Sequence, residues 1–229
     1  MAVILHIETS TGVCSTALSV NGTCLAENAD FTGYSHAEKL SPFVQNMLNF
    51  ARSERLKIDA VAVSCGPGSY TGLRIGVSTA KGLCYGLDIP LIAVHTLELL
   101  ANTVRKSLPA NALLCPMIDA RRMEVYTALF DMQLHLRRPV SAEIIDENSF
   151  GKELEQQPVY FFGDGAEKCR AVITHANANF LPDIYPLAKN MIGLAEQFFT
   201  EKQFEDVAYF EPFYLKQFVA TTPKNKIIS

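Results

Sequence analysis

A run of small residues placed directly after a short apolar segment constrains the fold of this chain more than any other feature. From position 66 to 82 it reads Gly-Pro-Gly-Ser-Tyr-Thr-Gly-Leu-Arg-Ile-Gly-Val-Ser-Thr-Ala-Lys-Gly. A strand, a glycine-rich loop and a helix start in this order often bind phosphate. The third glycine, however, comes one residue too late for a dinucleotide-binding fingerprint, and Gly72 is followed by Leu73 rather than by the lysine of a P-loop. Both of those nucleotide-binding motifs are excluded.

A ridge of small residues spaced four apart, Gly68, Gly72, Gly76 and Ala80, runs from the glycine-rich loop into the helix predicted over residues 71–87. Residues four apart share one face of a helix, so this ridge would let another backbone approach closely. Glycine costs about 1 kcal/mol relative to alanine inside a helix, so close packing must offset that cost. Spacing alone leaves open whether the approaching backbone belongs to the same chain or to a partner. For a partner, Gly76→Leu is predicted to abolish binding and spare the fold.

The remaining patterns predict an α/β protein of two lobes. The first lobe is expected over residues 1–107, with strands at 3–7 and 59–64, a hairpin at 15–26 around Asn21-Gly22, and a helix that starts at His36 or at Ser41. The second is expected over 108–229, with strands at 112–118, 123–130 and 159–162, a helix after Gly165, another at 187–199 and an extended stretch at 208–218.

Composition and charge limit the classes of protein to which this chain can belong. Apolar residues make up 48% of the chain and charged residues 19%, which suits a globular protein with a sizeable core. The net charge of −4 makes binding of tRNA or DNA by this chain alone improbable on electrostatic grounds. No apolar run approaches the roughly 18 residues of a membrane span, the start lacks the pattern of a signal peptide, and the six cysteines form no CxxC pair. We therefore expect a cytoplasmic protein with reduced thiols, no membrane association and no zinc ribbon.

Two short segments are candidates for nucleotide or phosphate contact. Glu8, Thr9, Ser10 and Thr11 follow the first strand, in the order of the first phosphate loop of actin- and hexokinase-type ATPases, where an acidic residue orients magnesium. Gly163-Asp164-Gly165 follows a strand of the second lobe. For either segment, an ordinary turn is the simpler explanation.

The remaining polar clusters do not predict a catalytic or metal site. His36 and Glu38 are close in sequence, but His36 has no histidine four residues on, so no metal site is expected. The turn at Asp119-Ala120-Arg121-Arg122 is interpreted as salt-bridged rather than catalytic. No serine or cysteine has the flanking residues of a nucleophile.

Five segments in order resemble the bacterial TsaB (YeaZ) family of tRNA threonylcarbamoyladenosine synthesis: residues 6–11, 35–42, 66–76, 119–121 and 211–216. The resemblance covers nearly the whole chain and implies a two-lobed actin-like ATPase (ribonuclease H-like) fold, each lobe a mixed sheet with helices. It also implies that the chain has lost most of the catalytic residues of this fold. Glu8 stands where the family more often has aspartate. Lys216 stands where arginine is common, and lysine does not reproduce the two-pronged hydrogen bonding of the arginine guanidinium.

The resemblance further implies a non-catalytic subunit that binds and activates a TsaD-like transferase, which attaches a threonylcarbamoyl group to the adenosine beside the anticodon of tRNA. A TsaE-like ATPase would join the pair, tRNA would bind only through the complex, and the chain alone would form a homodimer. ATP or ADP with magnesium is expected, if at all, at a partner interface. The residues carried over to the interface are His36, Leu40, Phe43, Met47, Ser69, Tyr70, Gly72, Leu73, Arg74, Gly76, Val77, Ala80 and Lys81.

Two alternatives stay open from the sequence. One is a free-standing kinase or ATPase of the same fold that uses Glu8 and the Gly163–Gly165 turn. The other is a peptidase, which the missing metal ligands disfavour. The stretch at 221–226 is expected to be a solvated tail or a contact to one of the partners.

Overall fold

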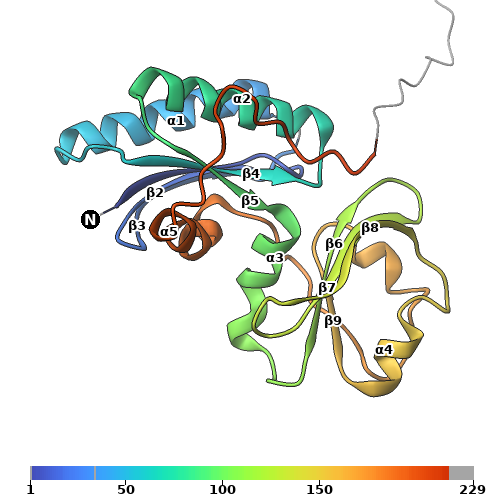
Figure 1. Ribbon diagram of the computed structural model, residues 1–229. Helices are drawn as coiled ribbons and strands as arrows, with labels where there is room; N and C mark the ends of the chain where they lie inside the picture. The colour runs from blue at the N-terminus through green and yellow to red at the C-terminus, as the bar shows by residue number, and fades with distance from the viewer. Residues whose placement is uncertain (1, 34, 217–229) are drawn as a thin grey trace, which may run out of the picture.

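The computed structural model describes residues 2–33 and 35–216, and Figure 1 shows two lobes, each built on its own sheet. The expectations for the tail at 221–226, and for the end of the extended stretch at 217–218, lie outside the described residues. The first sheet has the order β3-β2-β1-β4-β5 and the second the order β10-β9-β6-β7-β8. Both mix parallel and antiparallel pairs, as predicted for each lobe.

The first sheet is formed by five strands: β1 (Val3–Glu8), β2 (Cys14–Val20), β3 (Thr23–Asp30), β4 (Ala60–Gly66) and β5 (Leu91–His95). The predicted hairpin joins β2 to β3, where Asn21 and Gly22 both have positive φ (48° and 76°), as a type I′ turn requires. Strands β1 and β4 are buried along their whole length because helices cover both faces of the sheet.

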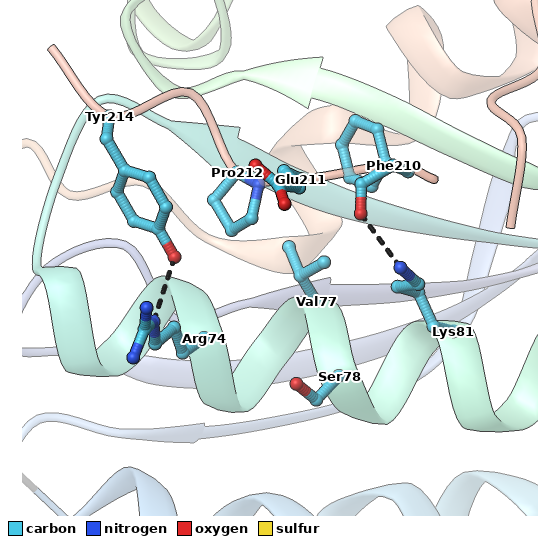
Figure 2. Close-up of a pocket in the computed structure, with 8 residues that line it drawn as sticks. All are labelled: Arg74, Val77, Ser78, Lys81, Phe210, Glu211, Pro212 and Tyr214. Atoms are coloured by element: carbon cyan, nitrogen blue, oxygen red, sulfur yellow. Dashed lines mark hydrogen bonds between the residues drawn. The ribbon is translucent and has the colours of Figure 1, made fainter. Parts of the chain in front are cut away.

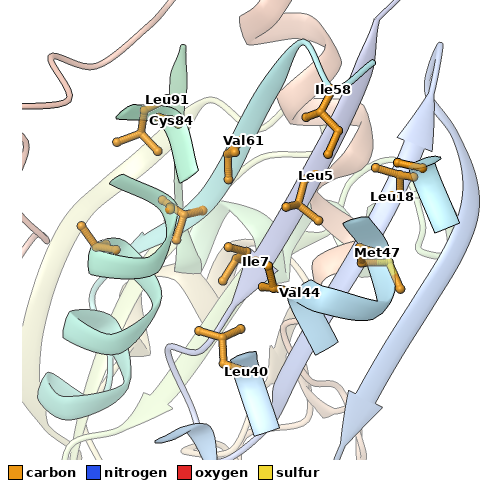
Figure 3. Packing of buried hydrophobic residues seen from close by; sticks show 14 of the residues in the cluster. Leu5, Ile7, Leu18, Leu40, Val44, Met47, Ile58, Val61, Cys84 and Leu91 are labelled. Carbon is orange, nitrogen blue, oxygen red and sulfur yellow. The ribbon is translucent and has the colours of Figure 1, made fainter. Parts of the chain in front are cut away.

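Helices α1 (His36–Ser53) and α2 (Tyr70–Leu87) lie side by side on one face of this sheet (Figure 1). Helix α1 begins at His36 and contains Pro42, which settles the choice between the two predicted starts. Apolar side chains of both helices meet alternate residues of β1, including Leu5 and Ile7, in the core that Figure 3 shows. The amphipathic stripe of each helix is therefore used up against the sheet.

The opposite face of the first sheet is covered by three elements: α3 (Thr96–Val104), η3 (Ala188–Met191) and α5 (Ile192–Thr200). Helix α3 also packs against the second sheet, where Leu97, Leu100 and Val104 meet Ile118 and Phe162. It is thus an apolar connector between the lobes. The sequence reading missed α3, and it placed residues 187–199 in the second lobe. Met191 and Leu194 instead pack on β1 and β5, so the division at 107/108 is wrong for the C-terminal segment.

The second sheet is formed by β6 (Leu113–Asp119), β7 (Glu124–Phe130), β8 (Leu136–Ile144), β9 (Val159–Phe162) and β10 (Ala178–Phe180), with α4 (Gly151–Gln156) beside it. Strands β6, β7 and β9 match the prediction. β8, β10 and α4 were not predicted. The helix expected after Gly165 is only a 3-10 turn, η2 (Glu167–Cys169).

Candidate functional site

The loop that follows β1 lies against the start of α2, and the ridge of small residues exists for this contact. A Cβ at Gly72 would overlap the carbonyl oxygen of Thr9, and one at Gly68 would overlap that of Ser10. A Cβ at Gly76 would overlap the hydroxyl of Thr9. The backbone that approaches the ridge is therefore the chain's own. Of the two alternatives that the spacing left open, this is the contact within the chain, so Gly76→Leu is expected to disturb the fold itself.

Hydrogen bonds hold this loop closed. The Thr9 hydroxyl donates to Gly72 O (2.8 Å), the amide of Ser69 donates to Ser10 O (2.6 Å), and His36 Nε2 lies 2.7 Å from Thr11 O. His36 is buried, so its part in this structure is to fix the loop from α1. Helix α2 starts beside the same loop, where the Ser69 hydroxyl caps it by accepting from the amide of Gly72 (3.2 Å).

Glu8 ends β1 with its side chain fully buried beneath the loop. Its Oε1 accepts hydrogen bonds from the amide (2.6 Å) and the hydroxyl (2.5 Å) of Ser10. Burial raises the pKa of the Glu8 carboxyl to about 7, and the bonds from Ser10 offset this only in part. His6, two residues earlier on the same side of β1, is also fully buried, and burial lowers its pKa to about 3.

The loop as placed does not fit a phosphate group. A phosphate loop aims free backbone N–H groups and hydroxyls at the ligand. Here the side chains of all four candidates, Glu8 to Thr11, are buried, and the amide of Ser10 and the hydroxyls of Thr9 and Ser10 already have partners within the chain. A nucleotide at this loop would have to displace contacts with α2.

The second candidate segment has a structural reason for its glycines. Gly163 has φ 102°, and a Cβ there would overlap the carbonyl oxygen of Met117 in β6; one at Gly165 would lie 2.8 Å from the backbone carbon of Ile118. These two glycines let the β9 turn pack on β6. Nucleotide contact at Gly163 and Gly165 stays a prediction.

The turn after β6 is held by an ion pair, although the partner of Asp119 is Lys168 and not an arginine of the turn. Asp119 pairs with Lys168, and its Oδ1 also accepts the amide of Arg121 at 2.9 Å. A further ion pair joins Lys216, near the end of the described chain, to Glu124. Among residues 2–33 and 35–216, no group of three or more His, Cys, Asp or Glu side chains could hold a metal ion. In the same part of the chain, no helix is long and apolar enough to cross a membrane.

The residues predicted for the partner interface separate into two sets. Eight are buried in the chain's own packing: His36, Leu40, Met47, Gly72, Leu73, Gly76, Val77 and Ala80. Five are at least partly exposed: Phe43, Ser69, Tyr70, Arg74 and Lys81. Leu40, Met47, Val77 and Ala80 pack in the core beneath the helices. His36, Gly72 and Gly76 instead contact the loop after β1. The interface role of all of these residues stays a prediction, and the exposed side chains of the second set are the ones best placed for a partner contact.

Helix α2 also has an outer face that points away from the sheet, formed by Ser78, Gly82, Tyr85 and Gly86. A Cβ added at Gly82 or at Gly86 would meet no atom of residues 2–33 and 35–216 within 4 Å, so no described residue requires glycine there. Tyr85 is 86% exposed. Two helix-weakening glycines beside an exposed aromatic ring lack an explanation within the described residues. In the sequence, Gly82 stands out only as a glycine that weakens the helix, and the spacing of small residues does not separate this face from the ridge.

A C-terminal strap, residues 208–214, runs along one flank of α2 and makes a groove with it (Figure 2). Lys81 Nζ donates to the carbonyl oxygens of Ala208 (3.2 Å) and Phe210 (2.9 Å), and Arg74 Nε donates to the Tyr214 hydroxyl (3.3 Å). The groove measures about 390 Å³ and is lined by Arg74, Val77, Ser78, Lys81, Phe210, Glu211, Pro212 and Tyr214. It opens next to the outer face of α2.

Comparison with known proteins identifies the family. Residues 30–224 match the model of the family described as TsaD, tRNA N6-adenosine threonylcarbamoyltransferase. The chain is 31% identical to the tRNA threonylcarbamoyladenosine biosynthesis protein TsaB of Escherichia coli (strain K12), over 95% of this chain and 96% of that protein. The chain belongs to the TsaB family. The TsaB protein of Bacillus subtilis (strain 168) is 37% identical over 70% of each chain.

Solved structures agree with membership of the TsaB family. A Pseudomonas aeruginosa protein described as similar to peptidase YEAZ superposes with a TM-score of 0.81 at 25% identity, covering 94% of this chain and all of that one. The two mixed five-stranded sheets are those of the two-lobed actin-like fold that the resemblance implied. The expected family and fold class are confirmed.

Proposed function

We propose that this protein takes part in tRNA threonylcarbamoyladenosine synthesis as a non-catalytic subunit. It would bind a TsaD-like transferase through the outer face of α2 and the neighbouring exposed residues of α1, and thereby activate transfer to tRNA. A TsaE-like ATPase would join this pair, and tRNA would be held by the assembly rather than by this chain. The names of its TsaB relatives support the pathway.

The observation that carries the partner role is the pair of exposed glycines on α2. Each costs about 1 kcal/mol of helix stability relative to alanine, and no described residue approaches Gly82 or Gly86 closely enough to require the missing side chain. Small residues on a helix surface let a second helix approach closely, and exposed Tyr85 adds apolar area to the same surface. This face has the features of a helix-docking surface, and the described residues leave it exposed.

The closed loop after β1 supports a subunit without its own phosphotransfer chemistry. Its polar groups are used to pack α2 against β1 rather than left open to a ligand. ATP or ADP with magnesium, if it binds at all, would bind at a partner interface.

The test is reconstituted threonylcarbamoyl transfer to tRNA with the cognate transferase, ATPase and carbamoyl-adenylate-forming enzyme, with and without this chain. We expect product formation to require it. Gly82→Leu should reduce both binding of the transferase and product formation at least tenfold. Gly193→Leu, a glycine on α5 with open space around its Cβ position, is the control. Equal product formation without the chain would refute the proposal and favour an ATP-using enzyme instead.

A further inference from the structure

The two helices that carry the face proposed for partner binding have, over their helical residues, a charge opposite to that of the whole protein. Helices α1 and α2 together carry four basic side chains, Lys39, Arg52, Arg74 and Lys81, and one acidic side chain, Glu38, a net charge of +3. The whole chain has a net charge of −4. A positive face on a negative protein favours an acidic surface opposite it, because complementary potentials set partner choice and encounter rate.

Within this face, Arg74 is held in a fixed position at the mouth of the groove. Its guanidinium lies 4.3 Å from the centre of the Tyr70 ring, and its Nε donates to the Tyr214 hydroxyl. No carboxylate lies within ion-pair distance of Arg74 among the described residues. The strap thus orients the guanidinium from one side and leaves its two terminal nitrogens without an acidic partner, so less side-chain freedom is lost when an anion binds.

The rest of the groove extends this positive site. Ser78, one helical turn after Arg74, is exposed, and Lys81 lies at the far end with its ammonium group on two carbonyl oxygens rather than on a carboxylate (Figure 2). Val77 and Pro212 line the middle of the groove. Glu211 is the single acidic side chain in the lining, so two cations face one anion.

We infer that this groove receives a carboxylate side chain from an acidic face of the partner protein, with Arg74 as its two-pronged donor. The inference rests on the proposed function and adds the chemistry of the partner. The planar guanidinium matches a carboxylate with two parallel hydrogen bonds. An aspartate or glutamate on the docking helix of the partner would place its carboxylate over Arg74 and Ser78. Small residues beside it on the same helix would pack against Gly82 and Gly86.

The same charge makes self-association a different reaction. Two copies pairing through the α1–α2 face would bring together two helix pairs whose helical residues each carry a net charge of +3. Salt screens exposed charges over about 10 Å at 0.1 M, so added salt should weaken binding of the acidic partner and strengthen pairing of identical chains. The two associations can therefore be separated by the sign of their salt dependence.

The experiment measures the Kd of the full chain for the cognate TsaD-like transferase by calorimetry at 50 and 300 mM NaCl. Arg74→Gln should raise Kd about tenfold, the usual loss for one charge-assisted hydrogen-bonding partner. Arg74→Lys should recover only part of that loss. The control, Arg137→Gln, removes the same charge from β8 of the other lobe and should change Kd by less than about twofold. Thermal unfolding checks that each variant is folded.

Two results would overturn the inference while leaving the partner role intact: an Arg74→Gln effect no larger than that of Arg137→Gln, or an affinity that rises with salt. Failure of the wild-type chain to bind the transferase at all would instead refute the proposed function.

Discussion

The buried carboxyl of Glu8 makes the stability of this protein depend on pH in a way that one substitution should remove. Glu8→Gln keeps the shape of the protonated side chain and an oxygen that can accept from Ser10. Burial raises the pKa of Glu8 from 4.5 to about 7 in the folded chain. Each pKa unit corresponds to about 1.4 kcal/mol, so ionising Glu8 in the folded state costs on the order of 3 kcal/mol.

The sign follows from proton counts in the two states. Between pH 4.5 and 7 the folded chain keeps the Glu8 proton and the unfolded chain has lost it, so the free energy of unfolding falls as pH rises through this window. His6 acts in the opposite direction, because burial lowers its pKa to about 3 and the unfolded chain takes up its proton below 6.5. The profile of the wild-type protein alone therefore mixes two opposing slopes.

The difference between Glu8→Gln and wild type isolates the carboxyl, because His6 is present in both proteins. Urea unfolding at half-unit steps from pH 4.5 to 8 should show the variant gaining stability relative to wild type by about 3 kcal/mol, with most of the change below pH 7. Glu38→Gln, an exposed carboxylate on α1, measures the background. A difference between Glu8→Gln and wild type that stays flat with pH would refute the burial argument.

Three further substitutions, two of glycines and one of a lysine, test the packing around α2. Gly76→Ala should lower the free energy of unfolding by about 2 kcal/mol, because its Cβ would overlap the Thr9 hydroxyl. Gly82→Ala should raise the free energy of unfolding by up to about 1 kcal/mol, because the added Cβ meets no described atom within 4 Å. Urea unfolding compares the two variants, and equal effects would contradict the division of the glycines into packed and exposed positions. Lys81→Met should loosen the strap, since the ammonium group holds the carbonyl oxygens of Ala208 and Phe210. Hydrogen exchange at the amide of Phe213, which donates to Cys65 O, should then speed up at least tenfold, and unchanged protection there would show that the strap is held without Lys81.

Local patterns in the sequence were sufficient for the elements that depend on near neighbours. Asn21-Gly22 specified a hairpin because both residues tolerate positive φ, and the apolar spacing of α1 and α2 predicted both helices. Helix α3 escaped the same reasoning. It contacts two sheets at once, so apolar residues lie on more than one of its faces and the helical period is blurred. Strand β8 is an edge strand with Pro139 and charged residues, and it lacks the alternation of a buried strand.

For the site, the sequence by itself determined that small residues line α2 and that another backbone must approach them. It could not decide whose backbone, because four-residue spacing is the same for a contact within the chain and for one between chains. Only the tertiary structure divided the glycines, since it placed Thr9 and Ser10 on Gly68, Gly72 and Gly76 and left Gly82 and Gly86 open. The strap on Arg74 and Lys81 was likewise invisible to local patterns, because it joins residues more than 120 positions apart through backbone carbonyls and a single hydroxyl, which carry no sequence signal.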